Sequence, residues 1–148
     1  MSLVAHYTAD ARLGDVLIAV NELRVRIGHA LPIDGVSFRL ARGETLALLG
    51  ESGSGKSLTA LALMGLLPRG AEQIAGRIEY AGRELTPNDT QLHRALRGRH
   101  LAMVFQEPMT SLNPVLSVGR QLGEAVQLHQ GLRGRALKER CIELFEAV

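Results

Sequence analysis

The sequence has few residues that cross-link or stack: one cysteine, no tryptophan and an aromatic fraction of 3%. The single cysteine, Cys141, excludes an internal disulfide and is typical of a reducing cytosol. No apolar run approaches the roughly 18 residues that a membrane-spanning helix needs. The N-terminus has no basic segment followed by an apolar core, so no signal peptide is expected. The composition therefore favours a soluble, cytosolic chain with an aliphatic core.

Charge is nearly balanced, since 17 basic and 15 acidic residues give a net charge of +2. The densest basic group, Arg94, Arg97 and Arg99, could contact nucleic acid or anionic lipid. However, no aromatic residues accompany it to stack on bases. We therefore interpret this group as a solvated helix face and expect no nucleic-acid partner. At 148 residues, the chain is long enough for one domain with its own core.

Apolar residues follow two periods along the chain, and together they predict an α/β fold. Strands are predicted at 17–27, 36–40, 45–49 and 101–105, the last two as buried strands, and a hairpin over 74–85 turns at 81–82. Helices are predicted at 56–67, 91–97, 118–129 and 137–148. Glycine and proline place a loop at 28–35, a hairpin turn at 41–44 and a polar loop at 106–114. Residues 1–16 are expected to form a loosely held leader.

Residues 50–57 match the pattern G-x-x-x-x-G-K-[S/T], and we call them the glycine loop. They lie between a predicted buried strand and a predicted helix, which is the context that a phosphate-binding loop for ATP needs. Glycines let successive backbone N–H groups curl around an anion, and the following helix adds unpaired N–H groups and its positive dipole end. The alternative is a glycine-rich turn with Lys56 merely exposed, but the whole pattern rarely arises by accident.

The glycine loop predicts contacts with ATP and Mg²⁺. Lys56 supplies a charge to the β- and γ-phosphates, and the Ser57 hydroxyl coordinates the Mg²⁺ that bridges them. The other expected nucleotide contacts, mainly through backbone donors, are Gly50, Glu51, Ser52, Gly53, Ser54, Gly55 and Leu58.

Gln106 is a second candidate, because it follows the predicted strand 101–105, where α/β sheets place ligand-facing residues. A glutamine there can hydrogen-bond a metal-bound water or an attacking water. From the residues alone, a surface glutamine that starts a loop is the simpler interpretation.

Three further stretches give the chain a family resemblance: 34–38 (Asp-Gly-Val-Ser-Phe), 43–49 (Gly-Glu-Thr-Leu-Ala-Leu-Leu) and 105–114 (Phe-Gln-Glu-Pro-Met-Thr-Ser-Leu-Asn-Pro). With the glycine loop, they resemble the ATP-binding subunit of bacterial ABC importers, in the dipeptide, oligopeptide and nickel branch. The resemblance runs from about Leu17 to the end of the chain and implies an ATP-binding subunit that energises import of peptides or similar small solutes.

The resemblance also implies the fold and its division. A P-loop NTPase (ABC ATPase) core is expected, with an N-terminal antiparallel β-subdomain and the start of a helical subdomain. Within an incomplete ATP-binding domain at 17–148, the expected parts are 17–49 and 74–85 (β-rich), 50–67 (glycine loop and helix), 101–114 (strand and Q-loop) and 115–148 (start of the helical subdomain).

The family pattern assigns further roles. Gln106 matches the catalytic Q-loop glutamine that contacts Mg²⁺, and residues 107–114, from Glu107 to Pro114, would face the transmembrane permease subunits. Ile27 occupies the place of the aromatic residue that stacks on adenine. A second ATP-binding subunit, identical or different, and a peripheral position on the cytoplasmic face of the inner membrane are also implied.

Three family motifs are absent: the L-S-G-G-Q signature, an apolar strand ending in Asp-Glu after the glycine loop, and the switch histidine. The family places all three beyond Val148. The chain is therefore expected to be truncated and not to hydrolyse ATP alone. One alternative is a non-hydrolysing fragment that binds nucleotide. Another is a different P-loop NTPase, such as a small-molecule kinase or DNA-repair ATPase, although the stretch 105–114 argues against it.

Overall fold

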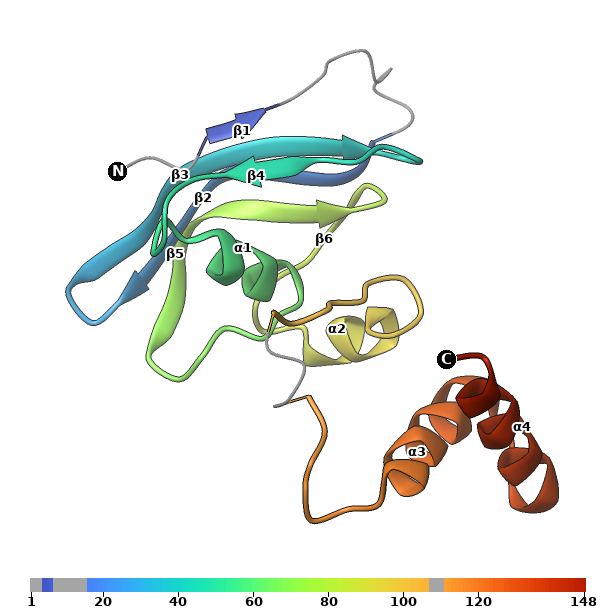
Figure 1. The fold of residues 1–148 in the computed structure, drawn as a ribbon. Helices are drawn as coiled ribbons and strands as arrows, with labels where there is room; N and C mark the ends of the chain where they lie inside the picture. The colour runs from blue at the N-terminus through green and yellow to red at the C-terminus, as the bar shows by residue number, and fades with distance from the viewer. Residues whose placement is uncertain (1–3, 7–15, 107–110) are drawn as a thin grey trace. The chain divides into compact units, whose positions relative to one another are not determined.

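The computed structural model describes residues 4–6, 16–106 and 111–148. The chain forms two compact units, Met1–Arg97 and Gly98–Val148. The first contains the strands and two short helices, and the second contains two longer helices (Figure 1). The combination of sheet and helices confirms the predicted α/β class.

The first unit contains an antiparallel sheet of four strands in the order β3-β2-β5-β6. These strands are β2 (Val16–Ile27), β3 (Ala30–Ala41), β5 (Ala71–Tyr80) and β6 (Arg83–Glu84). β2 and β3 pair along their lengths, from Val16 opposite Ala41 to Ile27 opposite Ala30. This sheet is the antiparallel β-part that the family resemblance implies.

The turn between β2 and β3 is shorter than predicted. Gly28 has a φ of 56°, and the chain turns over Gly28 and His29 before β3 begins at Ala30. The predicted loop 28–35 is therefore wrong for residues 30–35. Pro32 suggested a loop, but β3 is an edge strand, and an edge strand tolerates proline because its outward N–H groups need no partner in the sheet.

The hairpin between β5 and β6 turns at Ala81 and Gly82, as predicted. Both residues have positive φ values, 48° and 77°. Two successive positive φ values define the type I′ turn, whose twist matches that of the flanking strands. The backbone geometry thus accounts for the position of this turn.

β4 (Ala47–Leu49) corrects the prediction of a buried parallel strand at 45–49. It has three residues and pairs antiparallel with β1 (Val4–His6), so it belongs to a separate two-stranded sheet. Leu49 is 53% exposed. A parallel strand is covered on both faces only when neighbouring strands and helices flank it, and β4 pairs with no parallel strand in the described part of the chain.

Two further predictions change with β4. The turn at 41–44 is present, with the Glu44 N–H donating to the Ala41 carbonyl over 3.3 Å, but it is not a hairpin because β3 and β4 belong to different sheets. The backbone pairing of β1 also means that residues 4–6 of the predicted leader form a strand.

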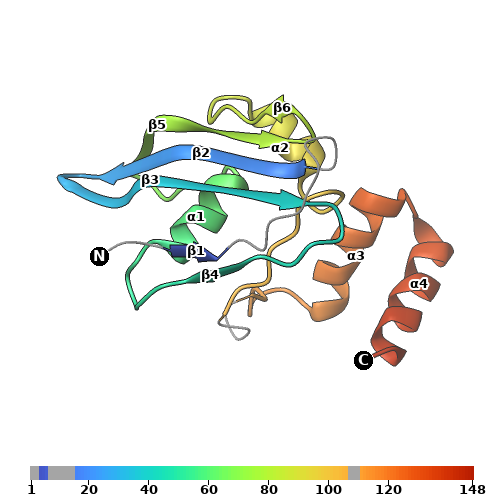
Figure 2. The same cartoon turned by 90° about the horizontal axis from the view of Figure 1, so that it is seen from above.

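Helices α1 (Lys56–Leu63) and α2 (Thr90–Leu96) lie on the same side of the four-stranded sheet, as Figures 1 and 2 both show. The core of this unit is aliphatic, with one phenylalanine. Its buried apolar residues are Ala19, Val20, Leu23, Val25, Ile33, Val36, Phe38, Ala62, Ile78, Leu85 and Leu96. Burial of these side chains is the main favourable term for folding.

α1 ends four residues earlier than predicted. The Leu66 N–H donates to the Leu61 carbonyl and the Gly65 N–H to the Ala62 carbonyl, while Gly65 has a φ of 61°. This pair of bonds is a Schellman motif, which a left-handed glycine completes without steric cost. α2 begins with the Asp89 carboxylate accepting from the Leu92 N–H over 2.9 Å.

The second unit contains α3 (Val118–Gln130) and α4 (Gly134–Glu146), close to the two predicted amphipathic helices. The predicted strand at 101–105 is not formed, and Val104 is 96% exposed. An apolar segment becomes a strand only by pairing, and no described strand lies beside this one in a sheet. None of the described helices is both long and apolar enough to cross a membrane.

Candidate phosphate-binding site

The glycine loop connects the end of β4 to the start of α1, and its shape depends on two glycines. Gly53 and Gly55 have φ values of 80° and 90°, which residues with a side chain rarely adopt. A Cβ at Gly55 would lie 2.7 Å from the Pro32 carbonyl oxygen and 3.1 Å from Ile33 Cγ1. Gly55 is therefore required both by its backbone angle and by the close approach of β3.

The N-terminus of α1 is open to an anion. Gly55 is its N-cap residue, no side chain caps the helix, and no acidic residue lies in its first turn. The unpaired N–H groups and the positive end of the helix dipole are therefore free to attract negative charge. This arrangement is the one that binds phosphate in many proteins.

Thr59 fixes the loop to the interior of the first unit. Its side chain is fully buried, and its N–H and Oγ1 both donate to the Gly55 carbonyl oxygen, over 2.8 and 2.9 Å. Two donors from one buried residue hold the peptide between Gly55 and Lys56 in place.

The Lys56 side chain turns back over the glycine loop. Its ammonium Nζ donates to the Gly50 carbonyl (2.6 Å), the Glu51 carbonyl (2.7 Å) and Ser54 Oγ (3.3 Å). These contacts use all three donors of the ammonium group. The positive charge thus lies against the curved loop. There, the oxygens of an incoming phosphate can replace these acceptors of the ammonium group.

The structure places the remaining loop residues in one turn. Ser54 is buried and its N–H donates to the Glu51 carbonyl, which closes the turn, while Ser57 is exposed on the first turn of α1. Glu51, Ser52 and Gly53 are also exposed, and Leu58 is half-buried. The predicted phosphate contacts of the glycine loop are thus brought together.

Ile27 belongs to the β2–β3 hairpin, whose second strand approaches the glycine loop at Pro32. It is 39% exposed, it pairs with Ala30, and Pro32 carries the carbonyl that faces Gly55. Figures 1 and 2 both show the hairpin tip projecting on the side where α1 begins. An exposed aliphatic side chain here can pack on a base but cannot stack on it.

The ABC transporter family model matches residues 33–148, a stretch that includes the glycine loop, α1, α2, α3 and α4. The chain belongs to the ABC transporter family. The resemblance that the sequence indicated is therefore confirmed, and with it the P-loop class of the fold.

Several curated proteins are similar to this ABC transporter chain. A putative peptide import ATP-binding protein of Brucella abortus (strain 2308) is 48% identical over 127 residues, 86% of this chain and 38% of that protein. The oligopeptide transport ATP-binding protein OppD of Salmonella typhimurium is 41% identical over 152 residues, 100% of this chain and 45% of that protein. The peptidoglycan transport ATP-binding protein YejF of Agrobacterium fabrum is 42% identical over 134 residues, 87% of this chain and 24% of that protein. The chain spans less than half the length of these relatives.

Gln106, the predicted Q-loop residue, belongs to the second unit of this ABC transporter chain. It is exposed and follows a segment without regular secondary structure, not a strand. Its contact with Mg²⁺ remains a prediction, as does that of Ser57 in the first unit. The described residues contain no group of three or more His, Cys, Asp or Glu side chains that could hold a metal.

The predicted permease-facing segment 107–114 is described in part. Residues 107–110 lie outside the described residues. Beyond them, Asn113 is attached to α3 by Gln121, whose Oε1 accepts from the Asn113 N–H (2.8 Å) and whose Nε2 donates to the Asn113 carbonyl (2.9 Å). The sequence did not predict this role of Gln121. The helical periodicity places Gln121 on α3 but gives no sign of its partner Asn113, which precedes the helix.

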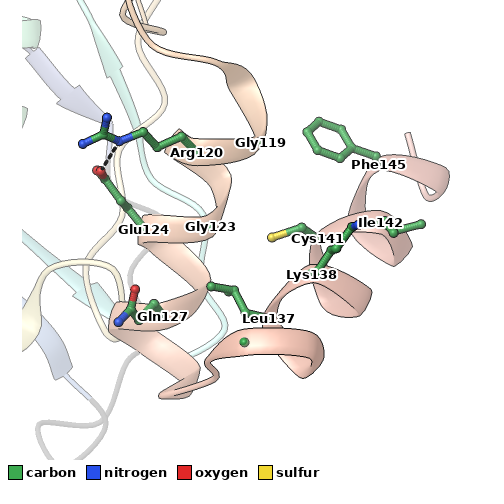
Figure 3. Close-up of a pocket in the computed structure, with 11 residues that line it drawn as sticks. Gly119, Arg120, Gly123, Glu124, Gln127, Leu137, Lys138, Cys141, Ile142 and Phe145 are labelled. Carbon is green, nitrogen blue, oxygen red and sulfur yellow. Dashed lines mark hydrogen bonds and ion pairs between the residues drawn. The ribbon is translucent and has the colours of Figure 1, made fainter.

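The second unit also has a groove of about 600 Å³ between α3 and α4 (Figure 3). Its α3 side includes Gly119 and Gly123, and its α4 side includes Leu137, Cys141 and Phe145. Cys141 is buried beside Gly123 of α3, where it packs as an apolar residue.

Arg97 corrects the interpretation of the basic group at 94–99. Its Nε donates to the Met64 carbonyl and its Nη2 to the Gly65 carbonyl, each over 2.8 Å. It is therefore half-buried against α1 and not part of a solvated face. No sequence pattern signals this contact, because the partners are main-chain atoms more than 30 residues away.

Proposed function

We propose that this chain binds ATP with Mg²⁺ and acts as an ATP-binding component of an ABC importer for peptides or similar small solutes. The observation that carries the proposal is the Lys56 ammonium, which lies against the glycine loop at the start of an uncapped helix. The printed names of the relatives support the peptide class, since they refer to peptide import and oligopeptide transport.

Each site residue has a proposed role. Lys56 neutralises the β- and γ-phosphates, the backbone donors of residues 50–58 surround them, and Ser57 ligates Mg²⁺. Gln106 supplies a second Mg²⁺ contact and orients water. Ile27 packs against the adenine ring.

The partners follow from the same proposal. Residues 107–114 contact transmembrane permease subunits, and a second ATP-binding subunit pairs with the first. These contacts place the protein peripherally at the cytoplasmic face of the inner membrane. Soluble components of this kind need no membrane span of their own.

The proposal is tested by titrating the 148-residue chain with Mg-ATP, Mg-ADP and AMP in a calorimeter. Because Lys56 and the helix N-terminus act on the β- and γ-phosphates, ATP and ADP are expected to bind at least about tenfold more tightly than AMP. AMP binding as tightly as ATP would mean that the glycine loop does not hold the phosphates.

The 148-residue chain is expected to bind ATP without hydrolysing it. Phosphoryl transfer needs several groups placed together, and this sequence has no apolar strand that ends in Asp-Glu after the glycine loop. We expect no phosphate release above the level of a Lys56→Ala variant in a continuous phosphate assay. Release that depends on Lys56 would contradict this prediction and favour a complete catalytic site.

A further inference from the structure

The C-terminal end of α1 is held from outside by a residue of α2. Arg97 is the C-cap residue of α2, and its N–H donates to the His93 carbonyl over 3.0 Å. The same residue extends its guanidinium to the carbonyls of Met64, the C-cap residue of α1, and of Gly65, the residue after it, both at 2.8 Å. One arginine therefore terminates α2 and caps α1.

This cap supplies what α1 lacks. The last carbonyls of a helix have no partner within it and carry the negative end of the helix dipole, so they attract cations. α1 has no basic residue in its last turn. A guanidinium offers its donors in a fixed planar fork, which matches two adjacent carbonyls. Hydrogen bonds from such a charged donor are stronger than neutral ones.

His93 gives α1 a second contact with α2. A Cβ added at Gly65 would lie 2.6 Å from His93 Cγ and Nδ1, so the imidazole ring lies flat against the glycine. His93 is only 2% exposed, and its Nε2 is 3.2 Å from the Thr86 carbonyl oxygen. The end of α1 is thus fixed by a polar cap and by close packing.

We propose that Arg97 is a positioning residue for the phosphate site at the opposite end of α1. α1 has eight residues and is therefore about 12 Å long, so it moves as a rigid rod. Displacement of its C-terminal end changes the direction in which the N–H groups of its first turn point. Thr59, whose N–H donates to the Gly55 carbonyl, transmits that movement to the glycine loop. This inference rests on the proposed binding of nucleotide phosphates at the loop.

The test compares Arg97→Ala and Arg97→Lys with a matched control, Arg94→Ala. Arg94 lies on the same helix, is exposed and is not part of the cap. Two quantities are measured: the dissociation constant for Mg-ATP by calorimetry, and hydrogen exchange of the Thr59 amide by NMR without nucleotide. Arg97→Ala is expected to raise the dissociation constant about tenfold, because misplaced N–H groups make poorly aligned hydrogen bonds to the phosphates. It should also accelerate Thr59 exchange.

Arg97→Lys keeps the charge but loses the fork, so smaller changes of the same sign are expected for both quantities. Arg94→Ala should stay within about twofold of the wild type. Unchanged Thr59 exchange in Arg97→Ala would overturn the proposal, as would faster exchange with an unchanged dissociation constant. If Arg97→Ala loses its cooperative melt, the same two criteria are applied to Arg97→Lys. If the wild type itself binds no Mg-ATP, the proposed function fails, and Thr59 exchange alone decides whether Arg97 orders the first turn.

Discussion

Replacing Lys56 with alanine should abolish detectable binding of Mg-ATP to the 148-residue chain. The ammonium donates to three oxygens of the glycine loop, and phosphate oxygens would replace these acceptors. Hydrogen bonds to charged groups contribute about 1.5–3 kcal/mol each. Loss of two such bonds therefore raises the dissociation constant by about two to four orders of magnitude. Calorimetric titration of both proteins under the same conditions measures the change.

The chain offers a matched control, since Lys138 is its only other lysine. Lys138 is exposed on α4 in the second unit, far along the sequence from the glycine loop. Lys138→Ala removes the same charge and should leave the dissociation constant within about twofold of the wild type. A Lys56→Ala variant that melts cooperatively and still binds Mg-ATP with wild-type affinity would show that the glycine loop is only a structural turn.

Local backbone chemistry made much of the first unit predictable. The turn at Ala81 and Gly82 and the open N-terminus of α1 depend on residues that are neighbours in the sequence. The same holds for the glycine loop, because a positive φ at Gly53 or Gly55 is a property of one residue. Features of this kind can be inferred from a sequence before any tertiary contact is known.

Strands at 45–49 and 101–105 were predicted less well, because a strand is defined by its partners. Both segments are apolar enough for a covered sheet, yet Leu49 and Val104 are exposed and the described strands offer neither segment a parallel neighbour. The opposite error occurred at 30–35, where Pro32 indicated a loop and pairing with β2 made a strand. In each case the tertiary partner outweighed the local pattern.

The cap from Arg97 to α1 shows the same limit at the level of a site. A basic residue just after a helix is an ordinary pattern, and its most frequent environment is solvent. Its partners here are two carbonyl groups, which carry no sequence signal. Supporting contacts of this kind depend on the three-dimensional fold, whereas the residues proposed to bind phosphate follow a sequence motif.

Gly55→Ala should both destabilise the first unit and remove Mg-ATP binding. Alanine at a φ of 90° is strained by about 1–3 kcal/mol. Its Cβ would also lie 2.7 Å from the Pro32 carbonyl oxygen, so β3 or the glycine loop has to shift, at a further cost of about 1–3 kcal/mol. Either shift moves the N–H groups that begin α1. Urea unfolding gives the loss of stability, and calorimetry gives the loss of affinity.

Gly53→Ala separates these two contributions. Gly53 has a φ of 80°, close to that of Gly55, but a Cβ there would meet nothing within 4 Å. Gly53→Ala should therefore cost only the backbone strain, and Gly55→Ala should lose about 1–3 kcal/mol more in the free energy of unfolding. Equal losses in the two variants would mean that β3 yields freely at Pro32 and does not restrain the glycine loop. A larger loss of unfolding free energy for Gly55→Ala, together with weaker Mg-ATP binding, would show that β3 restrains the conformation of the glycine loop.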